Sequence, residues 1–273
     1  MNTLYVSDLD GTLLYPNAEL SHKTITTLNK LLDQGLLFTV ATARSIASAK
    51  NILKDLKISL PIVLMNGVCI YDLAIDDYIN IEYLPKKSIP LLLNILKQNN
   101  MTGFAYSIKD SVMSTYYENL STQAMKDFYQ ERVNLYQKPF IQINDFEAIA
   151  TEPLIYFTFL DQREKLEPLF HLIDNLPGLN CVFYKDNYSP DLWYLETYSM
   201  TASKYDALLY LRNYLKPDKI VSFGDNRNDL PLFEASDVKI AVGNAVKELK
   251  DKADFIIGRN VEDGVATWLE HHV

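Results

Sequence analysis

The sequence predicts an α/β protein, in which a Rossmann-like parallel sheet covered by helices is interrupted by an inserted α+β domain. Short apolar segments alternate with amphipathic helical segments at the start of the chain and again near its end, and this alternation is typical of parallel sheets. The intervening region is rich in aromatic residues and lacks the alternation. The 273 residues are enough for two hydrophobic cores. We therefore expect a sheet domain of residues 1–82 and 189–273 and an inserted domain of residues 83–188.

The opening region is expected to supply the first strands of the parallel sheet. Three short apolar segments are predicted strands: Thr3–Ser7, Leu36–Ala41 and Pro61–Met65. Between the first two, apolar residues at helical spacing predict a helix that begins after Ser21 and ends at Gly35. Asn66-Gly67 is a strong turn signal at the end of the third strand.

The inserted region is expected to mix strands and helices. Its predicted strands are Gly103–Ile108, Leu154–Leu160 and Cys181–Lys185, and its predicted helices are Ser88–Gln98, Leu120–Glu131 and Gln162–Ile173. After Pro190 the parallel pattern is expected to resume. The predicted elements there are the helix Ser203–Tyr214 and the strands Leu192–Glu196, Ile220–Phe223, Val238–Val242 and Phe255–Ile257.

Composition and charge exclude several functions. The chain has 26 Lys and Arg residues against 35 Asp and Glu residues, a formal charge of −9. We expect no nucleic-acid partner, because affinity for a phosphate backbone depends on basic residues. No apolar run is long enough to span a membrane. Cys69 and Cys181 are expected to be reduced thiols rather than one distant disulfide, so the predicted location is the cytoplasm.

Four aspartates follow predicted strands. Asp8 and Asp10 come directly after the first strand, and Asp225 and Asp229 follow the strand Ile220–Phe223. Ligands bind at the carboxyl ends of parallel strands, so these carboxylates are expected to meet in one cleft. Their mutual repulsion there would favour a bound cation. Each segment alone could instead be a polar turn, but the pair of segments favours a functional site.

Two further residues suit an anionic ligand. Thr42 ends the second strand and offers a hydroxyl and an N–H group near a helix start, although a plain helix cap is the alternative. Lys204 lies in the first turn of a predicted helix, where the helix dipole disfavours a cation. This position indicates an anionic partner, and the alternative is a solvated surface lysine.

Taken together, these segments resemble the haloacid dehalogenase superfamily. Its four motifs are similar, in order, to Asp8-Leu9-Asp10-Gly11-Thr12-Leu13-Leu14, Thr42, Lys204 and Gly224-Asp225-Asn226-Arg227-Asn228-Asp229. Asn66-Gly67, Ala241-Val242-Gly243-Asn244-Ala245, Ala253-Asp254 and Asp263-Gly264-Val265-Ala266 resemble the Cof-type sugar-phosphatase branch, which carries a large α+β cap between the second and third motifs. One departure is Ala43, where that branch usually has glycine.

The resemblance implies a phosphatase with Mg²⁺ as cofactor. Asp8 would be the nucleophile that forms an aspartyl-phosphate, and Asp10 would be the general acid and then the general base. The metal would be held by the Asp8 carboxylate, the Asp10 backbone carbonyl and Asp225. The implied phosphate-binding groups are Leu9, Thr42, Ala43, Lys204 and Asn228. Asp229 would orient Lys204 or a metal-bound water.

The implied substrates are small phosphomonoesters. Sugar phosphates lead, with pyridoxal phosphate, flavin mononucleotide and nucleotides as alternatives, and the cap would select among them. A phosphotransferase or phosphomutase acting on sugar phosphates is a rival function, as is a non-catalytic protein that binds phosphorylated metabolites. The intact set of Asp8, Asp10, Lys204 and Asp225 favours an enzyme, because binding alone needs no nucleophile and no proton shuttle.

Overall fold

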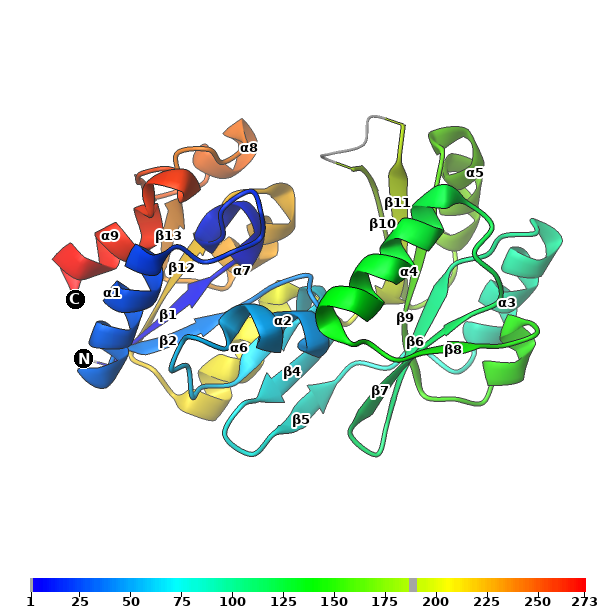
Figure 1. The fold of residues 1–273 in the computed structure, drawn as a ribbon, viewed down its shortest axis with the longest axis horizontal. Helices are drawn as coiled ribbons and strands as arrows, with labels where there is room; N and C mark the ends of the chain where they lie inside the picture. The colour runs from blue at the N-terminus through cyan, green and yellow to red at the C-terminus, as the bar shows by residue number, and fades with distance from the viewer. Residues whose placement is uncertain (1, 187–190) are drawn as a thin grey trace. The chain divides into compact units, whose positions relative to one another are not determined.

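The computed structural model describes residues 2–186 and 191–273, and the chain divides into two compact units (Figure 1). Unit 1 consists of Met1–Asn80 and Ala202–Val273, and unit 2 consists of Ile81–Thr201. The second unit is therefore an insertion in the first. This arrangement confirms the predicted fold class, a parallel α/β core with an added α+β domain.

Unit 1 is built on a five-stranded parallel sheet with the order β14-β13-β12-β1-β2 among the described residues. Its strands are β1 (Thr3–Ser7), β2 (Leu37–Val40), β12 (Lys219–Gly224), β13 (Val238–Ala241) and β14 (Phe255–Ile256). The central strand β1 pairs Tyr5 with Phe38 on one side and with Val221 on the other. Because both neighbours are parallel, the polar residues that follow β1 and β12 emerge at the same edge of the sheet.

Helices of unit 1 connect these strands. They are α1 (His22–Asp33), α2 (Ile46–Leu53), α6 (Lys204–Leu215), α7 (Leu230–Glu234), α8 (Lys247–Lys250) and α9 (Gly264–His272). Helix α1 begins as expected, since the Ser21 side chain accepts a hydrogen bond from the Thr24 N–H at 2.9 Å. It ends before Gly35, whose φ of +94° suits glycine.

The third predicted strand does not extend the parallel sheet. Strand β3 (Ile62–Leu64) instead pairs antiparallel with β4 (Cys69–Asp72), and β5 (Asp77–Ile81) completes a three-stranded sheet. One isolated parallel bridge, between Ala41 and Val63, joins β3 to the segment after β2 in the described chain. The turn that follows β3 returns the chain at once, so a hairpin forms in place of a crossover helix.

Unit 2 is a six-stranded sheet with the order β10-β11-β9-β6-β7-β8 over the part of the chain described. Its strands are β6 (Phe104–Lys109), β7 (Val112–Tyr117), β8 (Phe140–Gln142), β9 (Leu154–Asp161), β10 (Leu179–Lys185) and β11 (Trp193–Ser199). Neighbours are antiparallel except β7 and β8. Its helices are α3 (Ile89–Gln98), α4 (Gln123–Tyr136) and α5 (Arg163–Ile173).

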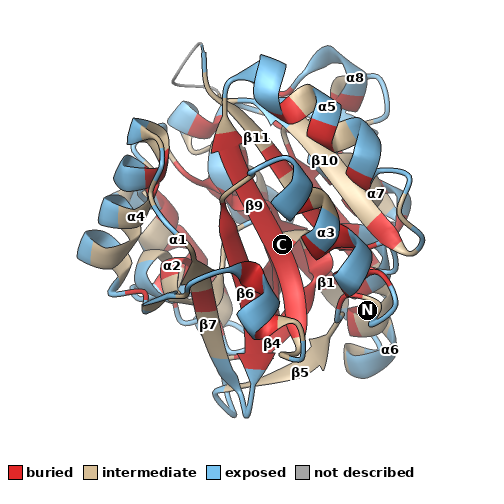
Figure 2. Ribbon diagram, turned by 90° about the vertical axis from the view of Figure 1, so that its right-hand side faces the viewer, coloured by how far each residue is buried: buried red, intermediate tan, exposed pale blue. Residues whose placement is uncertain are grey.

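The two faces of this sheet differ in chemistry. One face packs against α3 and α5 through a buried apolar core that includes Leu92, Phe157 and Leu166 (Figure 2). Strand β9 is buried along almost its whole length. The other face carries alternate residues of the same strands, many of them tyrosines, and α4 lies over part of it through the stacking of Phe128 on Phe104 at 4.7 Å.

The expected boundary between the domains differs from the structure. The predicted break at 188/189 lies outside the described residues, but β11, which was expected to return the chain to the parallel sheet, belongs to unit 2. Glu196 of β11 pairs antiparallel with Thr158 of β9 and with Val182 of β10. The predicted segment Leu192–Glu196 is a short, mostly apolar run that fits either sheet, so only the pairing partners place this strand. The chain returns to unit 1 at Ala202.

Two further expectations concern cysteines and membranes. Cys69 and Cys181 are both free thiols, as predicted. In the described residues, no helix combines the length and the apolar character needed to cross a membrane.

Candidate active site

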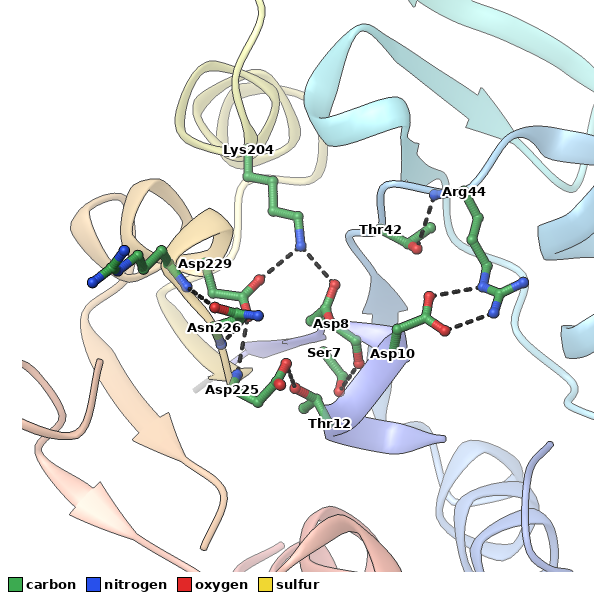
Figure 3. Close-up of polar contacts among 11 residues, drawn as sticks. Ser7, Asp8, Asp10, Thr12, Thr42, Arg44, Lys204, Asp225, Asn226 and Asp229 are labelled. Atoms are coloured by element: carbon green, nitrogen blue, oxygen red, sulfur yellow. Dashed lines mark hydrogen bonds and ion pairs between the residues drawn. The ribbon is translucent and has the colours of Figure 1, made fainter. Parts of the chain in front are cut away.

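Asp8 lies at the edge of the parallel sheet, directly after β1. Its backbone N–H donates to the Phe223 carbonyl at 3.0 Å, which continues the pairing of β1 with β12 by one residue. This register brings the ends of the two strands together and sets Asp8 close to Asp225 (Figure 3). The side chain of Asp8 is almost fully buried.

Lys204 reaches the same point from α6. The Ser203 hydroxyl accepts from the Asp206 N–H at 3.0 Å and so fixes where the helix begins. The ammonium group of Lys204 donates to Asp8 Oδ1 at 2.6 Å and to Asp229 Oδ1 at 2.7 Å (Figure 3). With 1% of its surface exposed, Lys204 is not a solvated surface lysine.

Asp229 uses both of its carboxylate oxygens for structural contacts. Oδ1 accepts from Lys204, and Oδ2 accepts from the backbone N–H groups of Asp225 and Asn226 at 3.0 and 3.1 Å. Asp229 therefore holds the lysine and the loop that carries Asp225. Gly224 permits this contact, because a Cβ there would lie 2.7 Å from Cβ of Asp229.

Asp225 is held by the turn that follows β1. Thr12 donates from its hydroxyl to Asp225 Oδ1 at 3.1 Å. Gly11 in the same turn has a φ of +80°, and a Cβ at this position would lie 2.4 Å from Asp225 Oδ2. Glycine is thus required both for the backbone conformation and for the space that the carboxylate occupies. Asn244 supports the turn by donating from Nδ2 to the Gly11 carbonyl at 2.7 Å.

The cluster carries more negative than positive charge. Asp8, Asp225 and Asp229 each offer a carboxylate oxygen, and these oxygens lie within 4.8 Å of one another. Burial, then repulsion from Asp229, raises the pKa of Asp8 well above its usual range. The same two causes raise the pKa of Asp225 to about 7. Burial alone would lower the pKa of Lys204, but the adjacent carboxylates outweigh it and raise this pKa. Such a donor set suits a divalent cation.

Asp10 lies in the same region but faces another partner. Arg44 donates from Nε to Asp10 Oδ2 at 2.7 Å and from Nη2 to Oδ1 at 2.6 Å, a bidentate ion pair (Figure 3). Half of the Asp10 side-chain surface is exposed. Arg44 also donates to the Ser48 hydroxyl at 2.9 Å, which anchors it to α2.

Thr42 is buried in the loop between β2 and α2. Its hydroxyl accepts from the Arg44 N–H at 3.1 Å. The alternative of a helix cap is wrong, because Ser45 occupies the N-cap position of α2. The loop is fixed by backbone bonds from Thr42 N–H to the Val63 carbonyl and from Asn66 N–H to the Thr42 carbonyl, both 3.0 Å long.

The remaining expected site residues are less closely joined to the cluster. Leu9 is fully buried in the turn after Asp8. Ala43 and Asn228 are exposed. Within residues 2–186 and 191–273, the Asn228 amide makes no hydrogen bond to the aspartate cluster, and Ala43 offers only its backbone N–H group. Sequence reasoning gave no role to Thr12, Arg44 or Asn244, although each lies within or beside a segment that it singled out.

Comparison with known proteins agrees with this geometry. Residues 5–269 match the family model of the haloacid dehalogenase-like hydrolases. The chain is 26% identical over 278 residues to a Bacillus subtilis protein named 5-amino-6-(5-phospho-D-ribitylamino)uracil phosphatase, covering 96% of this chain and 95% of that protein. It is 22% identical over 271 residues to the pyridoxal phosphate phosphatase of Escherichia coli, covering 97% of each.

Solved structures give the same result for the fold. The crystal structure of a Thermotoga maritima protein superimposes with a TM-score of 0.82 at 27% identity, covering 100% of this chain and 98% of the other. The resemblance noted in the sequence is confirmed. The chain belongs to the haloacid dehalogenase-like hydrolase family, among members that are phosphatases.

Proposed function

We propose that the protein hydrolyses small phosphomonoesters with Mg²⁺ through an aspartyl-phosphate at Asp8. The observation that carries the proposal is that the buried ammonium group of Lys204 pairs with both Asp8 and Asp229. This single positive charge orients the Asp8 carboxylate, but it does not neutralise the negative charge of the cluster. The Lys204 ammonium group donates a hydrogen bond to Oδ1 of Asp8, and no described residue donates one to Oδ2. That oxygen is the nucleophile.

The metal site consists of Asp8, Asp225 and the backbone carbonyl of Asp10. The excess negative charge of the cluster and the raised pKa values of Asp8 and Asp225 support a divalent ion there. Asp229 is a positioning residue, because its oxygens already accept from Lys204 and from two backbone N–H groups. When bound, Mg²⁺ supplies positive charge that offsets the repulsion between the nucleophile and the phosphoryl group.

The reaction takes two displacements at phosphorus. Asp8 Oδ2 forms a bond to phosphorus as the bond to the leaving oxygen breaks, and Asp10 gives that oxygen a proton. Water then attacks phosphorus, Asp10 takes its proton, and the Asp8 carboxylate and phosphate are released. In the structure both oxygens of Asp10 accept from Arg44, so Asp10 has to leave this ion pair before it gives or takes the proton.

The phosphoryl oxygens are held by groups around the nucleophile. These are the Thr42 hydroxyl, the Lys204 ammonium, the Asn228 amide and the backbone N–H groups of Leu9 and Ala43. Fixed donors of this kind stabilise the charge that develops in phosphoryl transfer. Ala43 retains its N–H group where the branch usually has glycine, so this contact does not need that residue.

The substrates are small phosphorylated metabolites, with sugar and polyol phosphates as the leading class. The B. subtilis relative is named for an ester of a ribityl chain, which supports a polyol phosphate. Unit 2 acts as the cap that selects the substrate. We place the enzyme in the cytoplasm.

A phosphatase assay over a panel of phosphomonoesters, with Mg²⁺ and with chelator, tests the proposal. We expect phosphate release that requires Mg²⁺ and is lost in Asp8→Asn. The matched control is Asp72→Asn. Asp72 is also a buried aspartate of unit 1, but among the described residues its side chain accepts only from the Ala74 N–H, at 2.8 Å. This control should stay active.

Three results would contradict parts of the proposal. A sugar phosphate isomer without free phosphate would indicate a phosphomutase. Binding without turnover of any ester would indicate a non-catalytic protein. Undiminished activity in a folded Asp8→Asn variant would exclude Asp8 as nucleophile.

A further inference from the structure

Asn244 belongs to the segment Ala241–Ala245, which resembles the Cof-type branch but has no part in the proposed reaction. The segment begins at the last residue of β13, a parallel neighbour of β12, so it lies at the same sheet edge as the aspartate cluster. The half-buried Asn244 amide is bound at both ends. Nδ2 donates to the Gly11 carbonyl at 2.7 Å, and Oδ1 accepts from the Asn260 N–H at 2.9 Å. Asn244 therefore joins the turn after β1 to the segment after β14.

Asn260 holds a second point of the turn after β1. It follows β14, and only 7% of its surface is exposed. Its Nδ2 donates to the Leu14 carbonyl at 2.8 Å. The asparagine pair, which we define as Asn244 and Asn260, is thus hydrogen-bonded to itself and to two carbonyl groups of the turn. These carbonyls belong to Gly11 and Leu14, which lie on either side of Thr12 in the sequence.

Thr12 connects this turn to a proposed metal ligand. Thr12 is 1% exposed, and its hydroxyl donates to Asp225 Oδ1 at 3.1 Å (Figure 3). The peptide group that precedes Thr12 is the one whose carbonyl accepts from Asn244. Because glycine has more accessible conformations than other residues, the peptide after Gly11 needs such a bond to keep one orientation. The Asn244 amide therefore fixes the backbone from which Thr12 reaches Asp225.

The loop that carries Asn244 also holds the main chain of Asp225. The Val246 N–H donates to the Asp225 carbonyl at 2.8 Å, and the Val242 N–H donates to the Gly224 carbonyl at 3.2 Å. The same short loop is therefore bonded to both chain segments that supply the proposed metal ligands, the turn after β1 and the loop after β12. This arrangement fixes the two segments relative to each other.

We propose that the asparagine pair positions the metal ligands. It fixes the turn that carries Thr12, and through Thr12 it sets the place of the Asp225 carboxylate relative to Asp8. The inference rests on the Mg²⁺ site of the proposed function. Both asparagines are positioning residues that act through the turn. Changing a residue that holds a metal ligand lowers metal affinity by about 10- to 100-fold, and we expect the lower end of this range for the more distant Asn244.

Calorimetric titration of Mg²⁺ alone into the protein measures this role without any substrate. Asn244→Ala should raise the dissociation constant for Mg²⁺ by about tenfold. The matched control is Asn29→Ala, because Asn29 is another half-buried asparagine of unit 1. Its amide also donates to a backbone carbonyl, that of Asp55, and accepts from a backbone N–H, that of Lys57, both at 2.8 Å. The control should lose a similar amount of thermal stability but keep the wild-type dissociation constant.

Thr12→Val tests whether the asparagine pair acts through Thr12. Valine has nearly the shape of threonine but cannot donate to Asp225, so this variant should also bind Mg²⁺ more weakly. The double variant Thr12→Val/Asn244→Ala should bind Mg²⁺ about as well as the weaker single variant, because two changes in one hydrogen-bonded chain are not additive. Losses of affinity that multiply in the double variant would overturn the route through Thr12.

Hydrogen exchange in the metal-free protein distinguishes failure of this inference from failure of the proposed function. The Leu14 N–H closes the turn by donating to the Leu9 carbonyl at 2.9 Å. Asn244→Ala should speed exchange at this amide by about tenfold, and Asn29→Ala should leave it unchanged. If the wild type binds no Mg²⁺, the proposed metal site is wrong, and faster exchange in Asn244→Ala still supports the hold of the asparagine pair on the turn. Unchanged exchange, or an unchanged Mg²⁺ dissociation constant in folded Asn244→Ala, overturns the inference.

Discussion

Replacing Lys204 by methionine tests the electrostatic basis of the site. The variant keeps most of the side-chain volume but removes the charge that Asp8 and Asp229 share. Because Lys204 and both carboxylates are nearly inaccessible to solvent, the change leaves two buried carboxylates uncompensated. Breaking a buried pair in this way costs about 3–5 kcal/mol. The variant should therefore be strongly destabilised. Asp8, whose pKa is already raised, should relieve part of the cost by taking up a proton at acidic pH.

The size of the effect follows from the part of the chain that unfolds. Unit 1 contains roughly 150 residues. With an unfolding entropy of about 2 cal/mol/K per residue, a loss of about 4 kcal/mol lowers the melting temperature by roughly 10–15 °C. Differential scanning calorimetry of the metal-free protein at pH 8 and at pH 5 measures this loss. We expect the larger decrease at pH 8, where protonation relieves less of the repulsion.

Lys57→Met is the matched control for this prediction. Lys57 pairs with Asp33 at 2.7 Å, which is also the distance between Lys204 and Asp229. Unlike that buried pair, both side chains of the control pair are more than half exposed. Exposed pairs contribute about 0–1 kcal/mol, so this variant should melt within a few degrees of the wild type. Equal losses in Lys204→Met and Lys57→Met would refute the argument from burial.

Three further predictions follow from the same geometry. In urea unfolding, Gly67→Ala should lower the free energy of unfolding more than Gly35→Ala does. Both positions have φ near +100°, but only at position 67 would the new Cβ lie 2.1 Å from the Ser203 carbonyl oxygen. Asp225→Asn should weaken Mg²⁺ activation yet stabilise the metal-free protein, since a pKa raised to about 7 makes the ionised carboxylate costly. The gain in the free energy of unfolding should be absent near pH 4, increase as the pH rises to 7 and then stay constant. A gain that decreases as the pH rises would contradict this prediction. Thr42→Val should lower kcat/KM by about 10- to 100-fold. An unchanged kcat/KM would exclude the proposed contact of the Thr42 hydroxyl with the phosphoryl group.

Much of the core could be predicted from its apolar strands. Thr3–Ser7 and the strand before Asp225 are short, mostly apolar segments, so their ends, and the aspartates that follow, are predicted to lie at one sheet edge. Parallel pairing of β1 with β12 then brings these residues together. The order of elements along the chain was enough for this part of the site.

Other features depend on tertiary packing that no local pattern specifies. The short apolar segment that begins β11 suits either sheet, so the place of this strand in unit 2 depends on β9 and β10. Asp10 was expected to face the aspartate cluster, but its carboxylate pairs instead with Arg44, which lies 34 residues further along the chain.

Covalent capture of the phosphoryl group at residue 8 tests the central proposal most directly. In Asp10→Asn the base for the water step is absent, and p-nitrophenyl phosphate has a leaving group that needs no acid, so a phosphorylated enzyme should accumulate. Acid quenching, borohydride reduction and peptide mass spectrometry should then find homoserine in place of Asp8. An active enzyme that releases p-nitrophenol while residue 8 remains unmodified at every time sampled would contradict nucleophilic catalysis by Asp8.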